Sequence, residues 1–234
     1  MNEFLLTNKN TISFSVEILA AVTGLLLLKK YELKAAKFFI YFLVYLTICD
    51  FVGNYVIYVK DGGIFSFLKD TVLSQNYWWS TLFWKIGAIM FFVFYYLKIL
   101  KTTIFKRILK ISGFSFFLFS ISYIILNWGD YFVMFFPAIS VFGAFIVFLC
   151  TVFYFIEVLK SDKIFTFYKS LNFYISFAVF IWWLIITPLV FYDVYMSRFD
   201  WDFIILRWQI YLIANITMYL TFTFALIWCK PEND

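Results

Sequence analysis

The chain contains no histidine, three cysteines and three prolines, and only 14% of its 234 residues are Asp, Glu, Lys or Arg. Soluble domains carry roughly 25% charged residues, so a soluble fold is excluded. The lack of histidine excludes a histidine general base, histidine metal ligands and a histidine pH switch. Cys49, Cys150 and Cys229 lie far apart, and their spacing predicts neither a disulfide framework nor a metal site. We expect no cofactor.

Long apolar runs are abundant instead. Apolar residues make up 65% of the chain and aromatic residues 26%. A helix needs about 20 apolar residues to cross a bilayer, and continuous rather than alternating runs favour helices over a transmembrane barrel. The sequence predicts an all-α, polytopic seven-helix transmembrane bundle that forms one domain over residues 1–234. The predicted spans are residues 11–28, 38–59, 78–100, 109–127, 132–156, 171–192 and 203–229.

Basic residues collect on one side of these spans. The connections after the first, third and fifth spans and the C-terminal tail contain thirteen Lys and Arg residues, whereas the opposite side contains four of them and seven acids. The positive-inside rule then places the N-terminus outside and the C-terminus in the cytoplasm. The basic residues lie in short connections without a nucleic-acid-binding motif, so we expect a lipid bilayer and no nucleic acid as partner.

Four ionisable residues lie inside the predicted spans. Lys85 interrupts the run "STLFWKIGAIMFF", residues 80–92. A helical rise of 1.5 Å per residue puts Lys85 about 10 Å, Asp50 about 14 Å, Glu17 about 9 Å and Arg207 about 6 Å below the outer boundary. Intramembrane charges cost about 2.5 to 3.5 kcal/mol each and normally pair inside a bundle. We therefore expect Asp50 to pair with Lys85, and Glu17 to lie near Arg207.

Small and polar residues share the helical faces of these charges. Asn54 follows Asp50 by four residues. Gln209 and Thr187 reach the depth of the four ionisable residues, and Thr187 is followed by a proline. The candidate layer comprises Glu17, Asp50, Asn54, Lys85, Thr187, Arg207, Gln209, Tyr211 and Asn215. Two interpretations stay open. The layer either fixes helix order through buried pairs or forms the floor of an outer pocket for a small polar ligand, an ion or a proton.

Known catalytic motifs are missing. The sequence contains no phosphate loop, dinucleotide fingerprint, metalloprotease helix or serine-nucleophile elbow, so we do not expect an enzyme. A retinal protein would need a Schiff-base lysine in the last span, and that span has none. A transporter needs polar residues that continue to the cytoplasmic side, and the sequence offers only a thin route through Thr151, Asn172, Ser176 and Asn215.

The segments "YFIEVLKSDKIFTFYKSLNFYISF" and "LIANITMYLTFTFALIWCK" resemble uncharacterised bacterial seven-helix inner-membrane proteins. The resemblance covers mainly the last three spans, implies a bacterial inner-membrane location and brings no activity with it. Our first hypothesis is a receptor or sensor component that responds to a small ligand and acts through a cytoplasmic or membrane protein partner. The alternatives are a transporter or channel for a small polar solute or ion, and an accessory or scaffold subunit with purely structural ion pairs.

Overall fold

The computed structural model describes residues 2–31, 35–60, 62–195 and 201–231. Within these ranges the chain forms helices and short 3-10 turns, and no β-strand. A π-helical segment, Ser80–Ile86, joins α3 to α4, so that the three form one continuous helix. The α-helices are α1 (Asn2–Leu26), α2 (Ala36–Gly53), α3 (Tyr77–Trp79), α4 (Gly87–Ile99), α5 (Thr103–Leu126), α6 (Pro137–Leu159), α7 (Leu171–Tyr195) and α8 (Trp201–Trp228).

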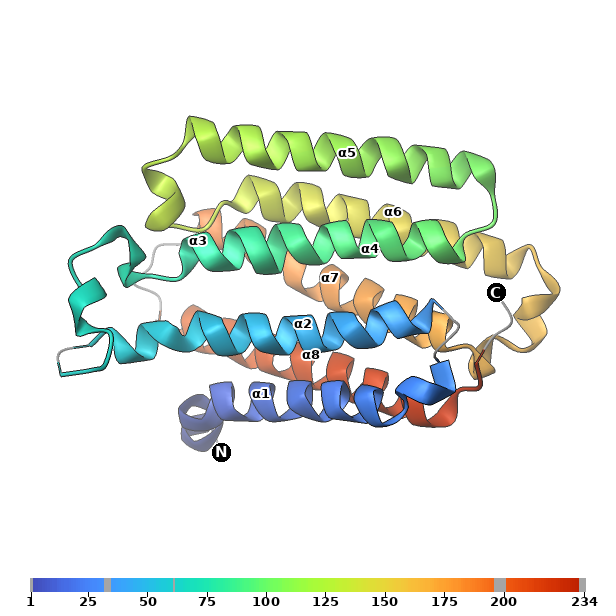
Figure 1. Ribbon diagram of the computed structural model, residues 1–234, viewed down its shortest axis with the longest axis horizontal. Coiled ribbons are helices and arrows are strands. Elements are labelled where there is room, and N and C mark those ends of the chain that lie inside the picture. The colour runs from blue at the N-terminus through green and yellow to red at the C-terminus, as the bar shows by residue number, and fades with distance from the viewer. Residues whose placement is uncertain (1, 32–34, 61, 196–200, 232–234) are drawn as a thin grey trace.

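Successive long helices run antiparallel and side by side (Figure 1). The start of α1 and the turns 54–76 and 127–136 lie at one end, which we call the N-terminal end. The turns 28–31, 100–102 and 160–170 lie at the other end, which we call the basic end. Helix α1 packs against α2 and α8, α8 packs against α7, α7 against α6, and α6 against α4 and α5. The first and last long helices are therefore neighbours.

Among the described residues, six helices are long and apolar enough to cross a membrane, which supports a multipass membrane protein. Large apolar side chains such as Phe51, Phe114 and Ile213 project outward from the bundle, where lipid would cover them. Helix α1 is not among the six, and it carries Lys9 and Glu17. A crossing by α1, and with it the seven-span count and the orientation of the termini, stays a prediction.

Helix boundaries differ from the predicted spans at four places, one of them the fourth helix, which begins at Thr103 instead of residue 109. The first helix begins at Asn2, well before residue 11, so residue 17 lies deeper in it than the sequence suggested. The second helix changes to a 3-10 helix at Asn54. The fifth begins at Pro137 instead of residue 132, because proline favours the first helical position and the preceding residue, Phe136, is extended. The other helices end within a few residues of the prediction.

Side chains cap the helix ends at the basic end. The Glu157 carboxylate of α6 accepts hydrogen bonds from the backbone N–H groups of Lys101 (2.9 Å) and Thr102 (2.7 Å), which precede α5. A carboxylate is favourable there, because the first N–H groups of a helix have no intrahelical partner. Lys30 Nζ donates to the Leu226 carbonyl, near the end of α8, at 3.1 Å.

Tyr31 strengthens the same junction. Its hydroxyl lies 3.0 Å from the carbonyl oxygens of both Leu226 and Cys229. The Leu226 carbonyl belongs to the last turn of α8, which leaves acceptors unpaired in an isolated helix, and Cys229 follows directly after that helix. The turn after α1 is therefore tied to the end of α8.

Candidate functional site

The most deeply buried acidic group of the described residues is the Glu17 carboxyl of α1, whose residue is only 2% exposed. It contacts the Asp50 carboxyl of α2 and the Tyr219 hydroxyl of α8 by side-chain hydrogen bonds. We call Glu17, Asp50 and Tyr219 the carboxyl cluster. A hydrogen bond between two carboxyl groups requires a proton on one of them, because two carboxylates at this separation repel each other.

One oxygen of the carboxyl cluster is unsatisfied. Glu17 Oε1 is fully buried and has no hydrogen-bond partner. Leaving a buried acceptor unpaired costs about 1 to 3 kcal/mol, and more when it is charged. Such a group is a candidate contact for a cation, a proton donor or a small polar ligand that enters between α1, α2 and α8.

Lys85 forms a different site. It lies in the π-helix, and its Nζ donates to Ser140 Oγ of α6 at 2.7 Å. The ammonium group also lies 4.7 Å from the ring centroid of Phe135, in the turn before α6. A lysine can extend its four-carbon stem along apolar surface to place its charge near the membrane boundary. Lys85 therefore faces α6 and the N-terminal end.

The π-helix has a specific support from α2. A π-helix leaves its carbonyl groups spaced differently from those of an α-helix, and such segments are frequent at functional sites. The Tyr45 hydroxyl donates to the Phe83 carbonyl at 2.6 Å. A Cβ atom at Gly87 would lie 2.6 Å from the Tyr45 oxygen, so this contact requires glycine there. Tyr45 is thus a side chain of α2 that supports the π-helix.

The structure shows other contacts for these residues than the predicted pairs. Asp50 contacts Glu17, and Lys85 donates to Ser140 of α6, so a pair between Asp50 and Lys85 stays a prediction. Glu17 contacts Asp50 and Tyr219 and not Arg207. Arg207 precedes Tyr219 by twelve residues, about 18 Å along α8, and so lies much nearer the N-terminal end.

Arg207 instead shares an aromatic ring with Lys9. Its guanidinium carbon lies 5.9 Å from the ring centroid of Trp208, and the Lys9 ammonium of α1 lies 2.7 Å from the same centroid. Lys9 precedes Glu17 by eight residues, about 12 Å along α1. Gln209 and Tyr211, on the same stretch of α8, are half-buried.

The remaining predicted residues are distributed around the bundle. Asn215 Oδ1 accepts a hydrogen bond from Trp182 Nε1 of α7 at 2.7 Å, so it ties α7 to α8. The Thr187 hydroxyl donates to the Trp183 carbonyl of its own helix at 2.6 Å. Asn54 is exposed where α2 changes to a 3-10 helix. The predicted layer is therefore several separate contacts, and the carboxyl cluster is the part that unites three helices.

Tyr219 and Ser140 were missed as partners of Glu17 and Lys85, and Tyr45 was missed as a support of the π-helix. Tyr219 follows Tyr211 and Asn215 at intervals of four residues and therefore lies on the same face of α8. That periodicity is a signal from which Tyr219 could have been found. For Tyr45 and Ser140 the sequence holds no comparable signal, because their contacts depend on which helices are neighbours.

The N-terminal end is held together by its own hydrogen bonds. The Tyr55 hydroxyl, after α2, donates to carbonyl groups of the 61–77 connection, at 2.7 Å for Leu73. Trp79 Nε1 donates to the Cys49 carbonyl at 2.9 Å, beside Asp50. The Tyr131 hydroxyl donates to the Trp78 carbonyl at 2.9 Å, and burial raises the pKa of Tyr131, so it remains a donor at neutral pH. The end of α2 near the carboxyl cluster is therefore fixed.

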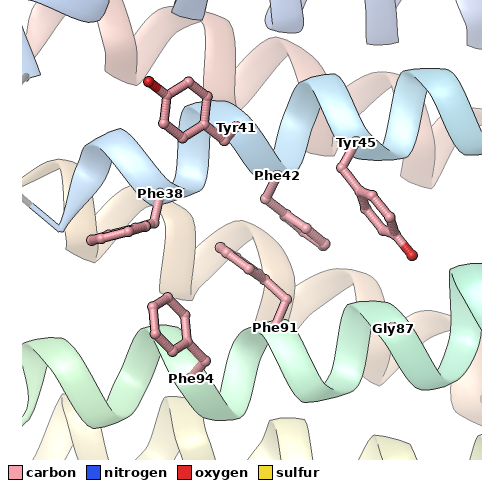
Figure 2. A pocket seen from close by; sticks show the side chains of 7 residues that line it. All are labelled: Phe38, Tyr41, Phe42, Tyr45, Gly87, Phe91 and Phe94. Carbon is pink, nitrogen blue, oxygen red and sulfur yellow. The ribbon is translucent and has the colours of Figure 1, made fainter.

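Two apolar hollows lie elsewhere on the bundle. One, of about 420 Å³, lies between α2 and α4 (Figure 2). The other, of about 330 Å³, lies between α6 and α7 and includes Thr187 and Pro188. Neither is lined by Glu17, Asp50, Lys85 or Arg207. Comparisons with family models, with characterised proteins and with solved structures found no match.

Proposed function

We propose that this protein is a receptor or sensor component of a membrane. In this proposal a small polar ligand or ion acts on the carboxyl cluster and shifts α1, α2 and α8 relative to one another. The supporting observation is the buried, unpartnered Oε1 of Glu17, placed where three helices meet. A ligand that satisfies this oxygen in one helix arrangement better than in another changes the population of the two.

The packing between the cluster and the basic end favours sensing over conduction. The Tyr219 ring contacts Phe222 at 6.0 Å between centroids, Phe222 contacts Phe39 at 4.9 Å, and Phe39 contacts Tyr95 at 6.0 Å. All four side chains are buried. Ions and polar solutes do not pass through closely packed aromatic rings. In the proposal, a displacement of the Tyr219 ring instead shifts the rings packed against it.

A partner protein would read this displacement at the basic end. Tyr95 continues the aromatic chain, and its hydroxyl donates to Asn172 Oδ1 at 2.6 Å, one residue inside the basic end of α7. We assign the basic end to the cytoplasm of a bacterium, because Lys and Arg are concentrated there. The resemblance to bacterial inner-membrane proteins supports the same location.

In vivo photo-crosslinking tests the proposal. A photoreactive residue is placed at Lys160, which is exposed at the basic end. We expect an adduct with a partner protein, and a change in its yield of about fivefold or more in Glu17→Gln and Asp50→Asn, the lower range of coupling between sites. Thr217→Val is the control, since Thr217 is an exposed position on α8 away from the cluster.

Reconstitution into liposomes distinguishes the alternatives. If the wild-type protein conducts ions or a solute, and Glu17→Gln abolishes this flux, the protein is a transporter or channel. If the adduct yield is the same in all variants while Glu17→Gln lowers the thermal stability, the cluster is structural and the protein is a scaffold. Size-exclusion profiles in detergent establish that each variant is folded.

A further inference from the structure

The groove between α2 and α4 is an aromatic surface open to the outside of the bundle (Figure 2). Its floor is the pair Phe42 and Phe91, whose rings stack with centroids 3.8 Å apart and planes inclined by 6°. Phe38 and Phe94 meet edge to face at 5.3 Å farther toward the basic end. The groove lies within segments that are apolar enough to cross a membrane, so lipid is the medium that meets it.

Two lysines stand at the basic end of this groove. Lys98 of α4 lies 5.8 Å from the ring centroid of Phe38 and 5.6 Å from that of Phe94. Lys37 of α2 lies 5.9 Å from the ring centroid of Tyr41, which also lines the groove. Both cations are thus held against groove residues by cation–π contacts and lie at the first turn of α2 and the last turn of α4, near the expected membrane boundary.

The opposite end of the groove is closed by Tyr45 and Gly87. Tyr45 points into the groove region from α2, and its hydroxyl is occupied by the Phe83 carbonyl. From Phe38 to Tyr45 the groove extends over seven residues, about 10 Å along α2. The surface is therefore apolar along its length and cationic only at the end toward the membrane boundary.

We propose that this groove binds an anionic phospholipid, with the phosphate between Lys37 and Lys98 and an acyl chain over Phe42 and Phe91. The charge arrangement selects this occupant. An apolar groove that ends in two cations complements a molecule with a long apolar chain and one anionic head. The inference does not depend on the sensor proposal.

Native mass spectrometry of the purified protein in detergent tests this assignment. Phosphatidylglycerol and phosphatidylcholine with identical acyl chains are titrated against the delipidated protein. We expect phosphatidylglycerol to bind at least about tenfold more tightly, because each lysine near an anionic headgroup contributes roughly a factor of five. In the double variant Lys37→Gln/Lys98→Gln this preference should fall to about twofold or less, while phosphatidylcholine binding stays unchanged.

The matched control is Lys106→Gln/Lys110→Gln. It removes the same charge at the same end of the bundle, but from α5, which does not line the groove. This variant should keep the wild-type preference for phosphatidylglycerol. The assignment is overturned if the wild type binds both lipids equally, or if both double variants lose the preference to the same extent, since that would show diffuse surface charge and no site.

Discussion

At the scale of single residues, the buried ionisable groups reach their partners in ways that follow from side-chain length. Lys85 carries its charge on a flexible stem and reaches the Ser140 hydroxyl on another helix. Glu17 and Asp50 have short side chains and contact only what lies directly opposite, which is each other. The acidic groups therefore mark the place where α1, α2 and α8 meet, and Lys85 marks the approach of the π-helix to α6.

Double-mutant cycles can check these partners. We expect Lys85→Met and Ser140→Ala to show a coupling free energy of about 1.5 to 3 kcal/mol, the usual net value of a hydrogen bond to a charged group. The effects of Lys85→Met and Asp50→Asn on the free energy of unfolding should be additive within about 0.5 kcal/mol, because the two side chains face different helices. The measurement is the free energy of unfolding in mixed detergent micelles. A larger coupling for Asp50 than for Ser140 would restore the ion pair that the sequence predicts.

The sequence predicted which ionisable residues lie inside the bundle, but it did not predict the contacts that the structure shows for them. Hydropathy and helical rise suffice to place Lys85 and Asp50 within spans. Partner choice depends on helix rotation and on lateral neighbours, neither of which is encoded in a local pattern. The placement of Glu17 and Arg207 at one level failed for a simpler reason, because α1 begins at Asn2 and extends the helix outward.

At the scale of elements, the π-helix is the feature that local sequence patterns did not predict. Its residues, "STLFWKI", are compatible with an ordinary α-helix, and the i to i+5 hydrogen bonding has no compositional mark. By contrast, the ends of most long helices were predictable within a few residues, because apolar runs stop where polar connections begin. Pro137 is a typical first residue of a helix, but the apolar residues before it led to an earlier predicted start.

Gly87→Ala tests the contact between α2 and the π-helix. The added methyl group would displace the Tyr45 hydroxyl from the Phe83 carbonyl. We expect overpacking to lower the free energy of unfolding by about 1 to 3 kcal/mol, and the higher helix propensity of alanine to raise it by about 0.5 to 1 kcal/mol. The measurement is thermal unfolding followed by tryptophan fluorescence.

Tyr45→Phe provides the decisive background for this substitution. Without the hydroxyl, Gly87→Ala should be neutral or stabilising, because the atom that the new methyl group meets is gone. Gly129→Ala is the control, since an added Cβ there meets nothing within 4 Å. Equal destabilisation of Gly87→Ala in both backgrounds would show that the clash with Tyr45 is not the cause.

At the scale of the whole molecule, short connections between long apolar segments predict an antiparallel bundle. The lateral order of the helices is a separate matter. The adjacency of α1 and α8 brings Tyr219 to Glu17, and nothing in the spacing of the two helices along the chain indicates it. Charge distribution predicts orientation independently of this order, and orientation can be measured directly.

Cysteine labelling measures the orientation, because the three native cysteines are buried. We expect a membrane-impermeant maleimide to label Gly129→Cys in spheroplasts, and to label Ser161→Cys only after permeabilisation. Residues 129 and 161 flank α6, so they must lie on opposite sides. Asn10→Cys, at an exposed position of α1, should be labelled with Gly129→Cys if α1 crosses. Labelling of Ser161→Cys in spheroplasts, with Gly129→Cys labelled only after permeabilisation, would contradict the positive-inside assignment. If Asn10→Cys is labelled together with Ser161→Cys, α1 does not span the membrane.

The tie between Lys30, Tyr31 and the last turn of α8 has a consequence for biosynthesis. Helices leave the ribosome in order, so α1 and α2 are made long before α8. Until then Glu17 lacks Tyr219, and Tyr31 lacks its carbonyl acceptors on α8. The position of the first hairpin is therefore secured only after α8 has been made and has packed against it.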